Sequence, residues 1–220
     1  MADLFHLWGL FLGTCVGLLP IIDPLSAAPA FLAMTEGHSE EKRLEQARRG
    51  CRAMVAILVS FLVAGRFIMA FFGLSIPGLR IAGGILLTGL GMRMLEQPAE
   101  REDAEEREAA RHKVDVSFSP LALPILAGPG SIAVTVGFTS LAKGWLDYAA
   151  IIAGILAVAA LTYVILRLSS RGVRSIGPVG VHAMTKIMGF LTLCIGVQFL
   201  VNGVLDPELV RRLHAPLAEP

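Results

Sequence analysis

The sequence contains the same proline-bearing phrase twice, once in each half of the chain. The first copy, PIIDPLSAA, runs from Pro20 to Ala28, and the second, PILAGPGSIA, runs from Pro124 to Ala133. Each phrase lies near the middle of a long apolar segment, where two prolines so close together should break a helix. Paired broken helices in corresponding positions of two halves are typical of transporters that bind their substrate at the breaks.

Composition predicts a membrane protein and excludes several other classes. The chain of 220 residues is 55% hydrophobic, and its mean hydropathy of +0.68 reflects apolar runs of membrane-spanning length. A net charge of +1 offers no basic surface to a nucleic acid. The histidines and cysteines are scattered without ligand spacing, so we expect neither a metal nor a cofactor. No catalytic constellation is present, and we expect no enzymatic activity.

Six apolar segments predict six transmembrane helices. They cover residues 4–34, 52–73, 78–95, 118–142, 146–167 and 186–205. A helix needs about 20 residues to cross the hydrocarbon core, so the longer first and fourth segments leave room for a break. We expect an all-α polytopic membrane protein with a single domain over 1–220, in which 1–96 is one repeat, 97–117 a charged connector, 118–206 the second repeat and 207–220 a tail.

Positive charges predict the orientation of these spans. The connectors after the first, third and fifth segments carry fourteen Lys and Arg residues, whereas the opposite side carries four. Because the side with more positive charges faces the cytoplasm, both termini should lie outside.

The repeat extends beyond the two proline phrases. The third segment, from Ile81 to Thr88, resembles the sixth, from Ile187 to Cys194. Each repeat holds an odd number of spans, so the two copies must be inverted relative to each other.

The two phrases predict two half-helices that begin at mid-membrane. Proline is favoured at the first helical position, and Asp and Gly are accepted as N-caps, so Asp23-Pro24 and Gly128-Pro129 each predict a helix start. Inversion makes both N-termini, each worth about +0.5 charge, face one space that suits a carboxylate. Asp23 would bind a coupling cation or an ammonium group, so the combination fits an amino acid.

The candidate substrate and ion site combines these two starts with a polar stripe on the sixth segment. Its residues are Asp23, Pro24, Ser26, Gly128, Pro129, Gly130, Ser131, Gln198 and Asn202. Simpler interpretations stay open for each part. Asp23 would then serve only as a cap, the prolines only as kinks, and the stripe only as a contact between helices. Arg66 either snorkels to the membrane surface or has a functional role.

Several strings in the chain resemble the MarC family. They are LPIIDP at 19–24, SIPGLRIAGG at 75–84, AGPGSIA at 127–133 and the glycine-rich stretch at 188–203. This resemblance covers nearly the whole chain apart from the charged connector and the tail. It implies a six-span bacterial inner-membrane protein related to transporters of small neutral amino acids such as glycine and alanine. The termini would then be periplasmic.

We therefore expect a secondary transporter of a small neutral amino acid that works by alternating access. No nucleotide-binding motif is present, so Na⁺ or H⁺ would supply the energy, and the bilayer and the substrate are the expected partners, with room for a homo-oligomer. One alternative is a non-transporting assembly or stress-response protein. Another is a thiol-disulfide electron carrier, which needs paired cysteines, but Cys15 in the first segment has no counterpart in the fourth.

Overall fold

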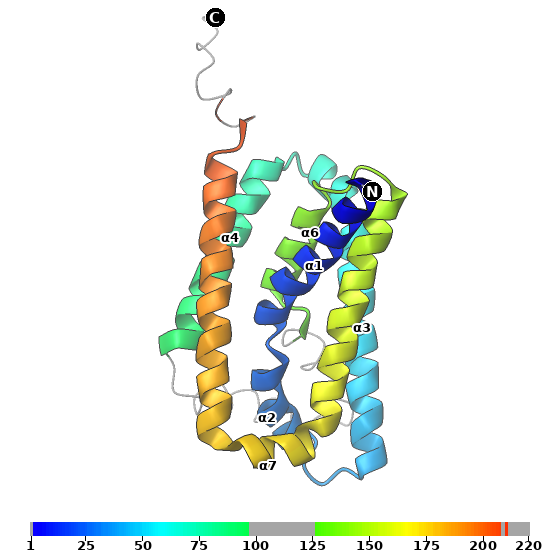
Figure 1. Ribbon diagram of the computed structural model, residues 1–220, viewed down its shortest axis with the longest axis vertical. Coiled ribbons are helices and arrows are strands. Elements are labelled where there is room, and N and C mark those ends of the chain that lie inside the picture. Colours follow the sequence, from blue (N-terminus) through cyan, green and yellow to red (C-terminus); the bar gives the residue numbers. More distant parts are fainter. Residues whose placement is uncertain (1, 97–125, 208–209, 211–220) are drawn as a thin grey trace, which may run out of the picture.

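The computed structural model describes residues 2–96, 126–207 and 210, and every regular element in these ranges is a helix. The helices are α1 (Ala2–Ile22), α2 (Pro24–Met34), α3 (Glu40–Phe71), α4 (Ile76–Glu96), α6 (Pro129–Phe138) and α7 (Trp145–Val204). They stand side by side as a bundle, and α1 begins at the same end of the molecule at which α7 finishes (Figure 1). The expected all-α class is confirmed.

The first broken helix consists of α1 and α2, which cross the bundle one after the other. The helix continues through Pro20 and stops at Asp23, whose φ of 36° and ψ of 68° are left-handed. Asp23 is the only non-glycine residue with a positive φ in the described part of the chain, a conformation that aspartate tolerates better than most residues. A new helix begins at Pro24, as the sequence predicts.

The second predicted break lies just before α6. Gly128 is the N-cap of α6, and Pro129 occupies the first helical position, again as predicted. Both α2 and α6 begin near mid-height, and they run toward opposite ends of the bundle (Figure 1). The charged connector 97–117 and the first part of the fourth segment, 118–125, lie outside the described residues, as does most of the tail.

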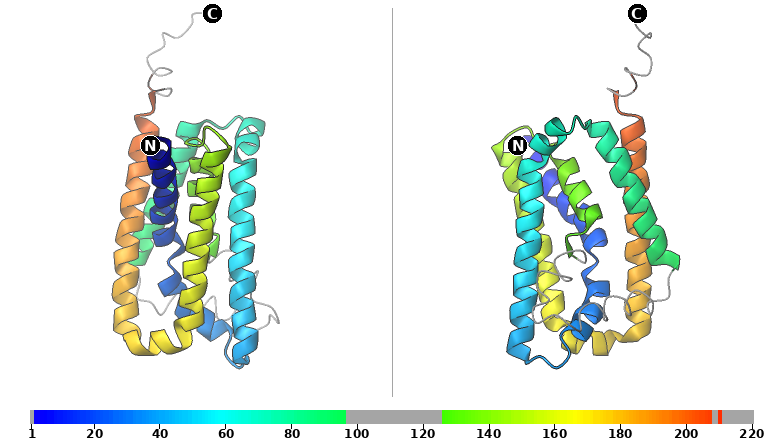
Figure 2. Two further views of the ribbon diagram at one scale, coloured as in Figure 1. Left: turned by 45° about the vertical axis from the view of Figure 1, so that its right-hand side comes forward. Right: turned by 180° about the vertical axis from the view of Figure 1, so that it is seen from behind.

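Two helix boundaries differ from the expected segments. The second apolar segment should begin at residue 52, but α3 begins at Glu40, because Ser39 caps it by accepting a hydrogen bond from the Lys42 N–H. The fifth and sixth segments belong to one helix of 60 residues, α7. A straight helix of that length would measure about 90 Å. Instead α7 descends, turns across the lower end and rises again (Figure 2).

The descending and rising arms of α7 organise the packing. The rising arm packs against α4 through glycines on both helices. On the rising arm these are Gly189, Gly196 and Gly203, and on α4 they are Gly84 and Gly91. A Cβ on Gly91 would lie 2.6 Å from the Leu193 nitrogen, so the two backbones are in direct contact. The seven-residue spacing of Gly189, Gly196 and Gly203 in the sequence predicts this close seam, and the structure confirms it. The four-residue spacing of Gly9, Gly13 and Gly17 predicts a second seam on α1, which is wrong at Gly9 and Gly13, where a Cβ would meet nothing within 4 Å.

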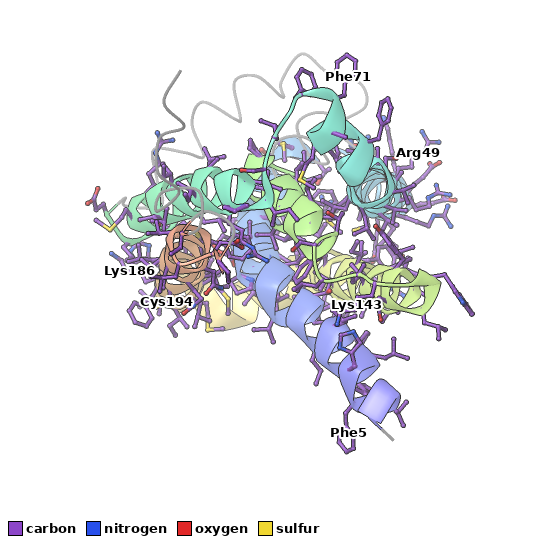
Figure 3. All side chains as sticks on the ribbon, turned by 90° about the horizontal axis from the view of Figure 1, so that it is seen from above. Phe5, Arg49, Phe71, Lys143, Lys186 and Cys194 are labelled. Carbon is purple, nitrogen blue, oxygen red and sulfur yellow. The ribbon has the colours of Figure 1, made fainter. Side chains whose placement is uncertain are left out.

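The outer surface of the bundle suits lipid. Within the described ranges, four stretches are long and apolar enough to cross a membrane, and α2 and α6 are shorter apolar helices. The four stretches are Leu4–Ile22, Ile76–Glu96, Trp145–Ser169 and Val179–Val204. Large apolar side chains are exposed around the periphery, with Phe5 at 76% and Phe71 at 73%. Both point away from the bundle when it is viewed along its length (Figure 3). An apolar surface this extensive requires an apolar solvent.

Candidate functional site

The starts of the two half-helices lie together inside the bundle. A Cβ added to Gly130, in the first turn of α6, would be 3.2 Å from the Ile21 side chain and 3.0 Å from Leu87 of α4. Ile21 stands two residues before the break at Asp23. One turn earlier in α1, a Cβ on Gly17 would be 3.7 Å from Val134 of α6. The break in the first helix therefore packs directly beside the beginning of α6.

Asp23 is a buried carboxylate at the start of α2. Its residue is 5% exposed, and its side chain accepts hydrogen bonds from the backbone N–H of Ser26, at 3.4 Å, and from the Ser26 hydroxyl. The carbonyl of Asp23 accepts the N–H of Ala27 at 3.1 Å. The N-terminus of α2 is thus capped as expected, and its positive end is offset by a negative charge from within the chain.

A short chain of hydroxyls links this cap to the rising arm of α7. The Ser26 hydroxyl also contacts Thr185 Oγ1. An ionised carboxylate only accepts, so Ser26 donates to Asp23, and Thr185 donates either to Ser26 or to the Val181 carbonyl at 3.0 Å. Thr185 can therefore separate from Ser26 and keep a hydrogen-bond partner. Thr185 could not be predicted from the sequence, because a single threonine in an apolar run has no distinguishing pattern.

The start of α6 has the opposite character. Gly128 has no side chain and supplies no side-chain cap, and Pro129 has no N–H. The Ile132 N–H bonds to the Gly128 carbonyl at 3.1 Å, which leaves the first-turn amides of Gly130 and Ser131 without an intrahelical acceptor. Ser131 is 1% exposed. Among the residues that the structure describes, no carboxylate caps the N-terminus of α6, in contrast with α2.

An apolar cavity borders the start of α6 on its other side. Its volume is about 470 Å³, and it lies between α3, α4 and α6. Its lining residues are Phe61, Ile68, Met69, Leu74, Leu79, Ala127, Pro129, Ile132, Ala133 and Val136. The polar groups of the two helix starts are absent from this lining. Such a space accepts aliphatic groups and offers nothing to a charge.

The structure does not bring the polar stripe of the sixth segment to the helix starts. Gln198 and Asn202 are exposed, and the Gln198 Nε2 donates to the Asn202 Oδ1 over 2.8 Å. Phe199 occupies the inward face at this level, beside Gly83 and Gly137. The pair lies on the outside of α7, as a contact between polar side chains. The side chain of Arg66 lies outside what the structure describes, so its two interpretations stay open.

Two cations join α4 to the rising arm of α7, one at each end of the bundle. At the upper end, Arg80 donates to the Asp206 carboxylate at 2.9 Å and to the Ser140 hydroxyl at 3.1 Å. At the lower end, the Lys186 ammonium donates to the Leu95 carbonyl at 2.5 Å. Arg80 and Lys186 are 106 residues apart, the same interval as the matching strings that follow them. Arg80 alone also ties this helix pair to the end of α6.

We expect Arg80→Gln to loosen the upper end of the bundle. The Arg80 and Asp206 side chains are 23% and 16% exposed, so the loss should fall between the ~0–1 kcal/mol of an exposed pair and the roughly 3–5 kcal/mol of a fully buried one. The melting temperature of purified protein should fall accordingly. The exchanged pair Arg80→Asp with Asp206→Arg should recover part of the loss, and no difference between Arg80→Gln and the wild-type protein would contradict this role.

The comparisons with known proteins agree with the fold. A family model described as MarC family integral membrane protein matches residues 8–207.

The chain belongs to the MarC family.

Relatives named inner membrane protein MarC from Citrobacter koseri and Salmonella typhimurium are each 37% identical over 97% of this chain and 100% of their own length. The corresponding protein of Escherichia coli O1:K1 is 36% identical over the same shares. No solved structure matches the chain. Together with the apolar helices, these findings show a multi-pass inner-membrane protein of the MarC family. The relatives' names state a location and no substrate.

Proposed function

We propose that this MarC-family protein is a secondary transporter of small neutral amino acids, such as glycine or alanine, with its site between the starts of α2 and α6. The observation that carries the proposal is the pairing of two helix starts inside one bundle, of which one is capped by the buried Asp23 and the other is uncapped. An anion is attracted to an uncapped N-terminus, and a cation to a buried carboxylate.

The charges of an amino acid match this arrangement. Its carboxylate would lie at the start of α6, and its ammonium group, or a coupling Na⁺ or H⁺, would lie near Asp23. The apolar cavity beside Pro129 favours a small aliphatic side chain over a charged one. Inverted-repeat transporters use the same combination, in which broken helices point their positive ends at a substrate carboxylate near the midplane.

We also propose that the chain forms six spans in two inverted three-helix repeats. The opposite directions of α2 and α6 (Figure 1) support this architecture, as do the equivalent cations Arg80 and Lys186 at opposite ends of the bundle. Inversion provides two related arrangements of the same parts, one open to each side. Alternating access would then exchange them around the fixed site.

Orientation in the membrane gives a separate prediction. The fourteen-to-four distribution of positive charges supports an orientation with the connector 97–117 in the cytoplasm and both termini in the periplasm. A reporter enzyme that is active only in the periplasm should be active when fused after Pro220 and silent when fused within 100–112. The reverse pattern would contradict the proposed orientation.

Flux in proteoliposomes tests the transport function. Purified protein should carry labelled glycine, alanine, serine or threonine into vesicles when a Na⁺ or pH gradient is imposed, and the effective gradient identifies the coupling ion. Empty vesicles and a labelled acidic amino acid serve as controls. Absence of flux under every gradient, from protein that is folded by its melting curve, would reject transport in favour of an assembly role.

A further inference from the structure

Two buried hydroxyls in the bundle are without a hydrogen-bond partner. Among the described residues, the side-chain oxygens of Thr88 on α4 and Thr192 on α7 are buried and accept or donate no hydrogen bond. Other buried threonines bond to a carbonyl one turn back, as Thr162 does to Val158 at 2.8 Å. An unpaired hydroxyl inside a protein is costly, so each of the two positions requires an explanation.

Thr88 is accounted for by close packing between helices. It faces α7 at Gly196, where an added Cβ would lie 2.7 Å from its oxygen and 2.5 Å from its backbone nitrogen. This contact is part of the glycine seam, in which the two backbones leave no room for a ligand. Thr192 is 0% exposed and stands four residues before Gly196, at the edge of the seam on the side toward Phe199.

Thr192 belongs to a stripe of α7 that faces the two broken helices. Thr185 and Phe199 stand seven residues before and after it, so the three side chains share nearly one face. Thr185 contacts Ser26 of α2, and the Phe199 ring lies 3.3 Å from a Cβ placed on Gly137 of α6. Thr192, which lies between them on this stripe, therefore faces the space between α2 and α6.

The position of Thr192 along the axis of the bundle follows from the same contacts. The rising arm of α7 and α6 run in the same direction (Figure 1). Phe199 lies level with Gly137, and seven residues back along either helix is a descent of about 10.5 Å. Thr192 is thereby brought level with Gly130, whose amide and that of Ser131 have no intrahelical acceptor.

We propose that the Thr192 hydroxyl and the amides of Gly130 and Ser131 together bind the substrate's carboxylate. This inference rests on the proposed function, which it deepens by fixing how the substrate is oriented. The carboxylate takes the place of the side-chain cap that Gly128 lacks, because it accepts hydrogen bonds from the two amides and from the Thr192 hydroxyl. Asp23 excludes a carboxylate from the start of α2, so the amino group faces that side.

Glycine binding to the purified protein, measured by titration calorimetry, tests the assignment. Thr192→Val keeps the shape and removes the hydroxyl, and it should weaken glycine binding about 10-fold or more, the range for a hydrogen bond to a charged group. Thr192→Ser should retain most of the affinity. Thr162→Val, on the same helix, is a matched control that should bind glycine as the wild-type protein does. Melting curves show whether each variant is folded.

A second measurement separates the carboxylate from the rest of the substrate. Acetate should compete with glycine in the wild-type protein and lose that ability in Thr192→Val, whereas glycinamide, which has no carboxylate, should be insensitive to the substitution. Unchanged glycine binding in Thr192→Val, equal losses for glycine and glycinamide, or failure of the wild-type protein to bind glycine or acetate would each overturn the proposal.

The binding and flux experiments test the carboxylate site and the transport function independently. Glycine binding that depends on Thr192, without flux in proteoliposomes, would support this carboxylate site and reject transport. Flux whose KM for glycine is the same in Thr192→Val as in the wild-type protein would support transport and overturn the role of Thr192.

Discussion

Asp23→Asn should reduce glycine transport by roughly 10- to 150-fold while the protein remains folded. Asparagine caps a helix about as well as aspartate, so α2 should still begin at Pro24. What is lost is one negative charge at a residue only 5% exposed. A buried contact to a charged group contributes about 1.5–3 kcal/mol, which corresponds to that loss of affinity for a cation or an ammonium group. Uptake into proteoliposomes measures the effect.

Asp23→Ala is the matched comparison, because it removes the cap as well as the charge. We expect this variant to lose transport and also about 1 kcal/mol of stability, seen as a lower melting temperature and a lower yield. Asp23 has left-handed backbone angles, which alanine adopts less readily, and this adds to the loss. If Asp23→Asn transported glycine with unchanged substrate and ion dependence, Asp23 would be a cap alone.

Gly91→Ala should be among the most destabilising single substitutions in the bundle. The new Cβ would lie 2.6 Å from the Leu193 nitrogen and 2.8 Å from the Gly189 carbonyl oxygen. These are backbone atoms, so the clash is relieved only when α4 and α7 move apart. Overpacking of this kind costs about 1–3 kcal/mol, or roughly 2–4 °C in melting temperature for each kcal/mol.

Gly89→Ala provides the control within the same helix. A Cβ at Gly89 would meet nothing within 4 Å, so only helix propensity changes, and alanine is favoured over glycine by about 1 kcal/mol. Its melting temperature should therefore equal or exceed that of the wild-type protein. Equal melting temperatures for Gly91→Ala and Gly89→Ala would contradict the close approach of α4 and α7.

The residues that the sequence predicted best are those whose backbone chemistry leaves few choices. Pro24 and Pro129 cannot continue a helix in the ordinary way, and Asp23 and Gly128 are natural caps, so both helix starts were predicted to the residue. Gly189 and its partners also lie where the seven-residue spacing placed them. Spacing alone was insufficient in α1, where a Cβ added to Gly9 or Gly13 would meet nothing within 4 Å.

Other features depend on tertiary contacts that a single sequence does not express. Polarity ends a membrane span without ending a helix, so α7 continues where the hydropathy pattern predicted only a connector. The stripe containing Gln198 had the right period, but its face is set by how α7 packs, and the structure turns it outward. Thr185 and Thr192 carry no pattern of their own in the sequence.

The central claim is that the two helix starts enclose one substrate site, and protection of a cysteine at Ser131 tests it most directly. The native cysteines Cys15, Cys51 and Cys194 are first replaced, and Ser131→Cys is then introduced as the reporter. The control is Ser75→Cys, in the exposed turn between α3 and α4. Saturating glycine should slow alkylation at position 131 several-fold and leave position 75 unaffected. Equal alkylation rates at position 131 with and without glycine would contradict the site.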